Sequence, residues 1–181
     1  MLISRKIRLR PKSLTDAHDD YAWQTDPELA RLDAVLPLNM TFPQYLAEYA
    51  RELRYPSLTK HLFAIETLEG KHIGTCVYFD TNDKDDAELG IMIGEREYWN
   101  KGYGTDAVGT LVGYIFRETK FHRIRLKTLE TNSRAQECFK KCGFIPFGHL
   151  FRNGYNFILM ELTRKKWQAQ QKESEVAGKN F

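Results

Sequence analysis

The stretch that most constrains this chain lies in its middle, where a strand pattern leads through a polar turn to two closely spaced glycines and a helical pattern. Leu89, Ile91 and Ile93 alternate along the strand, and Gly102 and Gly104 open the helix. Glycines let the backbone approach a ligand closely, and the first amides of a helix have no intrahelical partner. This order of elements therefore predicts an anion-binding site at a helix N-terminus.

The periodicity of the remaining chain predicts an α+β fold, or an α/β one, in which a mixed sheet is covered on both faces. Strands are expected at residues 6–10, 62–68, 72–79, 89–93, 123–129, 144–151 and 155–162. Helices are expected from residue 13, within 26–38, and at 42–53, 102–119 and 132–141. Turns are expected at Glu69-Gly70, at 81–86, and at Asn153-Gly154, a strong hairpin signal.

Length and composition favour one domain, expected at 1–163, followed by a polar tail at 164–181 that frays or adds a helix. The formal charge of +3 is mild, with positive residues scattered among acids, so we expect no nucleic-acid partner. The three cysteines, without a signal-peptide pattern, indicate a reducing cytoplasm. No apolar run is long enough to span a membrane, so we expect no membrane partner.

Two motifs resemble those of the Gcn5-related N-acetyltransferases (GNAT), and within them the RimJ/RimL-like branch. The first is Glu97-Tyr98-Trp99-Asn100-Lys101-Gly102-Tyr103-Gly104-Thr105-Asp106-Ala107, and the second is Asn132-Ser133-Arg134-Ala135, followed by Phe139, Lys141 and Gly143-Phe144. The resemblance runs from Ile7 to Leu162 and implies a mixed, mostly antiparallel central sheet flanked by helices. Trp99 replaces the Arg or Gln that usually opens the family's glycine signature, a form that looks like the RimJ/RimL variant.

The resemblance implies acetyl-CoA as cosubstrate, with loop amides binding its pyrophosphate and the end of the central strand pairing with its pantetheine arm. The implied cofactor-binding residues are Met92, Ile93, Gly94, Trp99, Asn100, Lys101, Gly102, Tyr103, Gly104, Thr105, Asn132 and Phe139. Two simpler interpretations stay open: the glycines merely form a tight turn, and Asn132 is only a helix N-cap.

A dinucleotide-binding protein is an alternative, because Gly102, Gly104 and Ala107 also fit the Gly-x-Gly-x-x-Gly/Ala fingerprint. In that motif the glycines follow the strand at once, and an acid ends the next strand about twenty residues later. Here several residues separate Ile93 from Gly102, and Glu130 comes too late. No Walker-type loop is present in the sequence.

Glu88 is the candidate catalytic base, because it opens the central strand and its spacing to Gly102 looks like that of the catalytic glutamate in the histone-acetylating branch. A carboxylate needs burial or a relaying water to deprotonate an ammonium, and Glu88 as a solvated strand residue is the alternative. Phe139 stands where many relatives carry a tyrosine that protonates the thiolate. The group that protonates the thiolate is therefore left open: it is water, Tyr103 or Tyr155, or the reaction needs no dedicated acid.

The expected partner is an amine-bearing substrate, either a protein N-terminus or a small molecule, and both a monomer and a homodimer stay open. Trp23, Tyr45 and Tyr55 could line the acceptor site, although aromatic residues at helical spacing usually belong to a core. We expect no metal, since Cys138 and Cys142 lack a second pair of ligands. The alternative from another functional class is a CoA-binding regulatory module without catalysis. It is favoured by Phe139 at the usual tyrosine position and by the open assignment of Glu88 as base.

Overall fold

The computed structural model describes residues 1–81 and 85–178 as an α+β fold built on one mixed, mostly antiparallel sheet, in the order β1-β2-β3-β4-β5-β6-β8-β7. The strands are β1 (Leu2–Ile3), β2 (Ile7–Pro11), β3 (Lys60–Thr67), β4 (His72–Asp80), β5 (Asp86–Ile93), β6 (Arg123–Leu129), β7 (Ile145–Arg152) and β8 (Tyr155–Thr163). The helices are α1 (Ala17–Thr25), α2 (Pro27–Leu32), α3 (Phe42–Arg54), α4 (Tyr103–Glu118), α5 (Ser133–Lys141) and α6 (Arg164–Gly178), with short 3₁₀ turns at Leu14–Asp16 and Arg96–Tyr98.

The expected strands and helices are confirmed, with ends shifted by a few residues. The Asn153-Gly154 hairpin is confirmed by the positive φ angles of 51° and 80° that a two-residue turn requires. The strand β1 was not predicted, because two residues carry no detectable alternation. Residues 82–84 of the turn expected at 81–86, and residues 179–181 of the tail, lie outside the described residues.

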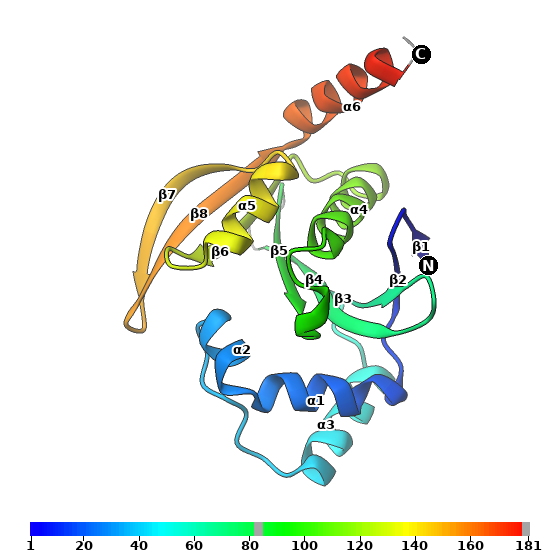
Figure 1. Cartoon of the computed structure of the whole chain (residues 1–181), viewed down its shortest axis with the longest axis vertical. Helices are drawn as coiled ribbons and strands as arrows, with labels where there is room; N and C mark the ends of the chain where they lie inside the picture. Colours follow the sequence, from blue (N-terminus) through cyan, green and yellow to red (C-terminus); the bar gives the residue numbers. More distant parts are fainter. Residues whose placement is uncertain (82–84, 179–181) are drawn as a thin grey trace.

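The helix α4 packs an apolar stripe against the sheet. Its stripe includes Val108, Leu111, Val112 and Ile115, each at most 1% exposed, and packs across β2, β4 and β5. Figure 1 shows α1, α2 and α3 grouped below the sheet and α6 extending from the opposite end. The tail after residue 163 is thus helical over the part described, and Trp167 packs on Phe116 of α4.

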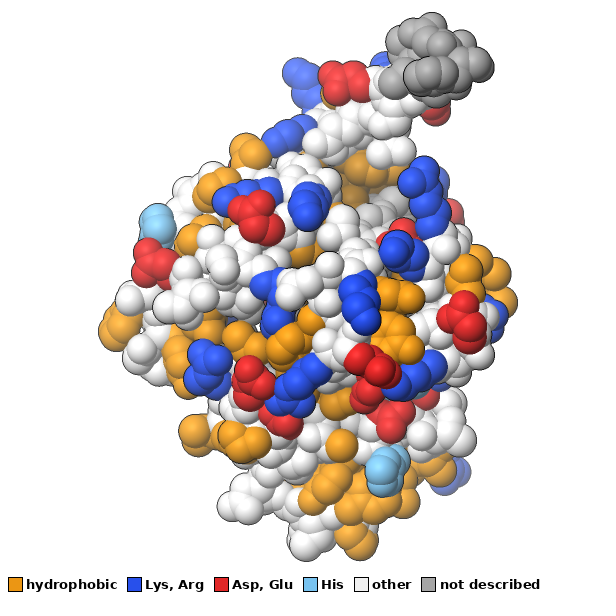
Figure 2. Space-filling model, viewed as in Figure 1, with side chains coloured by type: hydrophobic (Ala, Val, Ile, Leu, Met, Phe, Trp, Pro, Cys, Tyr) orange, Lys and Arg blue, Asp and Glu red, His pale blue; other side chains and the backbone are white. Residues whose placement is uncertain are grey.

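Surface charges are mixed on the face seen in Figure 2, where Lys and Arg side chains alternate with Asp and Glu rather than gathering in one patch. In the part of the chain that the structure describes, no helix is long and apolar enough to cross a bilayer.

The two central strands diverge, and this divergence opens a cavity between them. β5 pairs with β6 in parallel only from Asp86 to Glu88, opposite Arg123 to Arg125. Beyond Glu88, β5 continues to Ile93 beside β4, while β6 continues to Leu129 beside β8. Within the described residues, no strand therefore pairs with the free edge of β5 from Leu89 onward, and its backbone groups up to Ile91 are available to a ligand.

Candidate functional site

A cavity of about 900 Å³ lies where β5 and β6 separate. We call it the central cavity; its walls come from α2, β4, β5, the loop before α4, β6, α5 and β8. It brings together ten of the residues predicted for the site: Glu88, Met92, Ile93, Trp99, Asn100, Gly102, Gly104, Thr105, Asn132 and Phe139. Residues up to 51 positions apart in the sequence, Glu88 and Phe139, thus meet at one cavity.

The glycine loop, residues 99–105, has the backbone geometry of an anion cradle. Asn100 has a φ of 58° and Gly102 a φ of 83°, so both adopt the left-handed conformation. Gly102 is the N-cap of α4 and has no side chain to satisfy the first amides of the helix. A Cβ on Gly104 would lie in ordinary contact with Cys138 Sγ at 3.6 Å, so the fold itself would accept one. Internal packing therefore does not require the glycine at 104.

Trp99 braces this loop between β5 and α5. Its indole Nε1–H donates a hydrogen bond to the Ile93 carbonyl at 2.7 Å, at the end of β5. The Arg134 guanidinium lies 3.6 Å from the centroid of the Trp99 ring. Burial lowers the pKa of Arg134, with Glu28 opposing that change, yet the group stays cationic at any ordinary pH. A permanent positive charge therefore lies on the cavity wall beside the loop.

Glu88 lies at the point where the strands separate and pairs with Lys127 of β6. Lys127 Nζ donates to Glu88 Oε1 at 2.6 Å, and the two side chains are 40% and 43% exposed. Asp33, directly after α2, lines the same part of the cavity. Its side chain is exposed, yet the surrounding cavity walls partly desolvate its carboxyl. This desolvation raises the pKa of the carboxyl, while Lys127 opposes the rise. Two carboxyl groups and one ammonium therefore share this end of the cavity.

The start and middle of α5 form the opposite wall. Asn132 Oδ1 accepts a hydrogen bond from the Ala135 amide at 3.2 Å, so the N-cap role is present, and the residue also lines the cavity. Phe139 is 5% exposed and packs edge-on against Phe144. Phe139 thus presents only hydrocarbon to the cavity and offers no proton.

Three of the predicted site residues lie outside the cavity lining. The Gly94 amide donates to the Ile73 carbonyl at 2.9 Å, and its Cα faces the Trp23 indole. The Lys101 carbonyl accepts from Lys6 Nζ at 3.0 Å. The Tyr103 ring packs edge-on against Tyr98.

The aromatic residues considered for acid catalysis or for the acceptor site are also absent from this lining, namely Tyr103, Tyr155, Trp23, Tyr45 and Tyr55. Trp23 and Tyr45 are core residues at 6% and 7% exposure, whereas Tyr55 is 69% exposed. The usual role of aromatic residues at helical spacing, packing in a core, therefore accounts for the first two.

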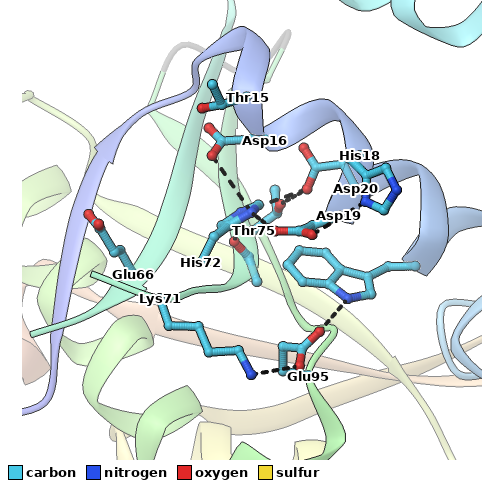
Figure 3. A network of polar contacts seen from close by, with 12 residues as sticks. Thr15, Asp16, His18, Asp19, Asp20, Glu66, Lys71, His72, Thr75 and Glu95 are labelled. Atoms are coloured by element: carbon cyan, nitrogen blue, oxygen red, sulfur yellow. Dashed lines mark hydrogen bonds and ion pairs between the residues drawn. The ribbon is translucent and has the colours of Figure 1, made fainter. Parts of the chain in front are cut away.

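A buried polar network fixes α1 against β4, next to the end of β5. Lys12, 2% exposed, donates to Asp20 Oδ2 at 2.7 Å and to Thr75 Oγ1 at 2.6 Å. Burial lowers the pKa of Lys12, with Asp20 opposing. Figure 3 shows Asp16, Asp19 and Asp20 converging on His72 of β4. Since α2 follows α1 directly, this network also positions the cavity wall that carries Asp33.

Trp23 extends this network to β5. Its ring packs on His72 at a centroid distance of 4.8 Å, and its Nε1–H donates to Glu95 Oε1 at 3.3 Å. A Cβ built on Gly94 would come within 2.1 Å of the Trp23 ring. Gly94 therefore serves the close approach of α1 to the end of β5.

A family model described as an acetyltransferase (GNAT) domain matches residues 6–145. Because this match covers most of the chain, the protein belongs to the GNAT acetyltransferase domain family. An uncharacterized N-acetyltransferase p20 from Bacillus licheniformis is 25% identical over 152 residues, covering 82% of this chain and 84% of that protein.

Solved structures show the same fold at low sequence identity. A spermidine N-acetyltransferase from Vibrio cholerae, in complex with CoA and spermine, superposes with a TM-score of 0.78 at 21% identity, covering 90% of this chain and 98% of that one. An aminoglycoside acetyltransferase AAC(6')-Ib in complex with coenzyme A gives a TM-score of 0.75 at 18% identity, covering 91% and 99%. These likenesses establish the mixed-sheet acetyltransferase architecture.

Sequence reasoning missed three charged residues of the cavity, namely Asp33, Lys127 and Arg134. Asp33 follows a six-residue helix between prolines, a segment whose pattern was too irregular to place. Lys127 is an exposed position in the alternating pattern of β6, which by itself marks no site. Only the pairing of β6 with β5 shows that it lies near Glu88. Arg134 lies two residues after Asn132, the N-cap of α5, within the second motif. That position near the start of the helix was the available sequence signal for Arg134.

Proposed function

We propose that this protein is an acetyl-CoA-dependent N-acetyltransferase that transfers an acetyl group to the primary amine of a small molecule. The observation that carries the proposal is the meeting, in one cavity, of the unpaired edge of β5 with the uncapped N-terminus of α4. An extended amide-bearing arm ending in a pyrophosphate suits that combination. The RimJ/RimL-like affiliation, a homodimer and a cytoplasmic location stay predictions.

The residues present fit coenzyme A in two ways. The amides at the start of α4, opened by Gly102 and Gly104, suit the pyrophosphate, with Arg134 as a nearby cation. The free edge of β5 from Leu89 to Ile93, apart from the Ile93 carbonyl that Trp99 holds, suits the amides of the pantetheine arm, which would add like a strand. When bound, the cosubstrate supplies an activated acetyl thioester. Asn132 and Phe139 would then form the facing wall.

Glu88 is the residue we assign to proton removal from the acceptor amine. It lies where the strands separate, and it lines the cavity. Because its carboxylate is half exposed and paired with Lys127, we assign it the role of holding a water that relays the proton, rather than direct abstraction by a strongly basic group. The neutral amine then attacks the thioester carbonyl directly in a ternary complex.

The departing thiolate needs no dedicated acid in this proposal. Phe139 carries no proton, and neither Tyr103 nor Tyr155 lines the cavity. A thiolate is a good leaving group that water can protonate after the acyl bond breaks.

A small cationic acceptor is supported by the charges at the acceptor end. Asp33 and Glu88 provide two carboxyl groups against the single ammonium of Lys127, so this end favours a positively charged ligand. Structural relatives solved with spermine and with the aminoglycoside ribostamycin are consistent with that choice. A protein N-terminus is the alternative acceptor.

The test is turnover of acetyl-CoA with a panel of amines, followed as free thiol. The panel should contain a monoamine, a diamine, a polyamine, an aminoglycoside and a peptide with a free N-terminus. We expect thiol release that depends on a small amine, together with a product heavier by one acetyl group. If the protein binds acetyl-CoA but none of the amines causes thiol release, it is instead the non-catalytic CoA-binding module that Phe139 favours.

Cofactor choice is tested separately by thermal stability. Acetyl-CoA at a hundredfold excess over Kd should raise the free energy of unfolding by about 2.7 kcal/mol, because it binds only the native state. NAD should not stabilise the protein. Protection by NAD without protection by CoA would favour the dinucleotide-binding alternative.

A further inference from the structure

One wall of the central cavity carries a thiol that the proposed acetyl transfer does not use. Cys138 lines the cavity from α5, and its Sγ lies 3.6 Å from where a Cβ of Gly104 would be. Cys142, one turn further along, is absent from the cavity lining, and Cys76 is 1% exposed. The three cysteines therefore differ sharply in access from the cavity.

The surroundings of Cys138 stabilise its thiolate. The Thr105 hydroxyl donates to Cys138 Sγ at 3.6 Å, at the N-terminal turn of α4. The neighbouring Cys142 thiol lowers the pKa of Cys138; burial opposes this effect, while Thr105 and Lys141 add to it. Burial raises the pKa of Cys76 to about 12, so that thiol stays protonated. Hydrogen-bond donors and positive potential are the features that make a cysteine nucleophilic.

We propose that Cys138 is a covalent modification site, at which its thiolate exchanges with a low-molecular-weight disulfide and thereby closes the central cavity to coenzyme A. In the exchange, Cys138 Sγ attacks one sulfur of the disulfide and forms a new S–S bond. The old S–S bond breaks, and the second half leaves as a thiolate. No further oxidant is needed, because the small disulfide is the oxidised partner.

The adduct should persist rather than pass to Cys142. Residues four apart on a helix have Cβ atoms about 5–6 Å apart, whereas a disulfide requires about 3.5–4.5 Å. The Cys142 amide donates to the Cys138 carbonyl at 3.3 Å, so helical spacing extends to Cys142. An internal Cys138–Cys142 disulfide would therefore have to distort the end of α5.

The modification should exclude the cofactor because Cys138 and the glycine loop share one wall. Any group attached to Cys138 Sγ extends into the space beside Gly104 and Thr105. This part of the inference rests on the proposed function, which places the pyrophosphate of CoA in that space.

The experiment treats the full-length native protein with 5,5′-dithiobis(2-nitrobenzoic acid) and measures the released thiolate by absorbance. Peptide mapping locates the adduct, and Cys138→Ser and Cys142→Ser are compared with wild type. We expect Cys138 to react at least about tenfold faster than Cys142 or Cys76, and Cys138→Ser to lose the fast phase. Cys142→Ser should keep it, because Thr105 and Lys141 remain and the serine hydroxyl replaces the Cys142 thiol as a hydrogen-bond donor. A folded protein in which Cys142 or Cys76 reacts first would overturn the proposal.

Two further readouts separate this inference from the proposed function. Acetyl-CoA at a hundredfold excess over Kd should slow the fast phase by about 100-fold, since only the free protein reacts. Treated wild type should lose CoA binding and regain it with dithiothreitol, whereas Cys138→Ser should bind CoA equally before and after treatment. If CoA raises the melting temperature but does not slow the labelling, the inference fails and the proposed function stands. If CoA does not bind, the proposed function fails, and the relative reactivity of the three cysteines still decides whether Cys138 is the reactive thiol.

Discussion

At the level of single residues, Glu88 and Lys127 form the charged pair nearest to the separation of β5 and β6. Their Nζ–Oε1 distance of 2.6 Å and half-exposed side chains describe a pair that solvent can open. An acceptor ammonium can therefore compete with Lys127 for the Glu88 carboxylate. The pair keeps the Glu88 carboxylate oriented until a substrate arrives.

Replacement of Glu88 tests its role in proton removal. Glu88→Gln should keep the affinity for acetyl-CoA but lower kcat by about 10²- to 10⁴-fold near neutral pH, where the amine arrives protonated. Raising the pH should restore part of the rate, because a neutral amine needs no base. The measurement is a pH–rate profile of both proteins. Lys127→Met is the matched control, since it breaks the ion pair and keeps the carboxylate.

Coincident pH–rate profiles for wild type and Glu88→Gln would show that Glu88 is only a solvated strand residue. If Lys127→Met reproduced the whole loss in kcat, the ion pair rather than the carboxylate would be responsible.

At the level of elements, the start of α4 offers a clean comparison of two glycines on one helix. Gly104→Val should leave the protein folded, because its Cβ meets Cys138 Sγ and Ile93 Cγ1 at 3.6 and 3.7 Å, but its methyl groups should block CoA binding. Gly109→Val is the control, since a Cβ there meets no described atom within 4 Å. Calorimetry of CoA binding measures both. Equal affinity in the two folded variants would move the cofactor away from this loop.

A second element-scale prediction concerns the contact between α1 and the end of β5. Gly94→Ala should lower the free energy of unfolding by about 1–3 kcal/mol, because its Cβ would lie 2.1 Å from the Trp23 ring. Gly148→Ala, whose Cβ would be 3.7 Å from Leu159 Cδ1, should change stability by only about 0.5 kcal/mol. Urea denaturation measures both. If the two variants were equally stable, the Trp23 ring would have to move aside at little cost.

Local signals made the elements predictable from sequence, whereas the cavity depends on pairings between distant segments. The Asn153-Gly154 turn and the Gly102 N-cap both need positive φ, and sequence alone shows such positions. The separation of β5 from β6 has no local signal, because it is a property of two strands whose paired residues are 37 apart in the chain. Lys127 and Asp33 therefore join the site only in three dimensions.

Lys12 shows the same limit in the polar network between α1 and β4. A lysine after Pro11 is typical of an exposed loop, yet its side chain is 2% exposed because Asp20 and Thr75 satisfy its ammonium. The buried position follows from α1 folding back on β4, which no residue near Lys12 predicts.

At the scale of the whole molecule, this polar network ties the stability of the α1–α3 region to pH. Burial opposes ionisation of Asp16, but hydrogen bonds from the Arg10 guanidinium and the Ser13 amide outweigh it and lower the pKa of Asp16 from 3.8 to about 2. The Asp16 side chain is 3% exposed, so solvent screens these interactions weakly. The folded state thus favours the ionised form more than the unfolded chain does.

Asp16→Asn should accordingly destabilise the protein in a pH-dependent way. Because the pKa is lower in the folded state, the contribution is complete above the unfolded value of 3.8 and is lost as pH falls through about 2. At neutral pH the variant should lose roughly 2 kcal/mol of unfolding free energy, and the gap from wild type should narrow as the pH falls from about 4 to about 2. Urea denaturation across this range measures the gap. Asp19→Asn, at a side chain that is 44% exposed, is the control and should cost less. A gap for Asp16→Asn that stayed constant down to the lowest pH would show that lost packing, rather than the lost charge, destabilises the variant.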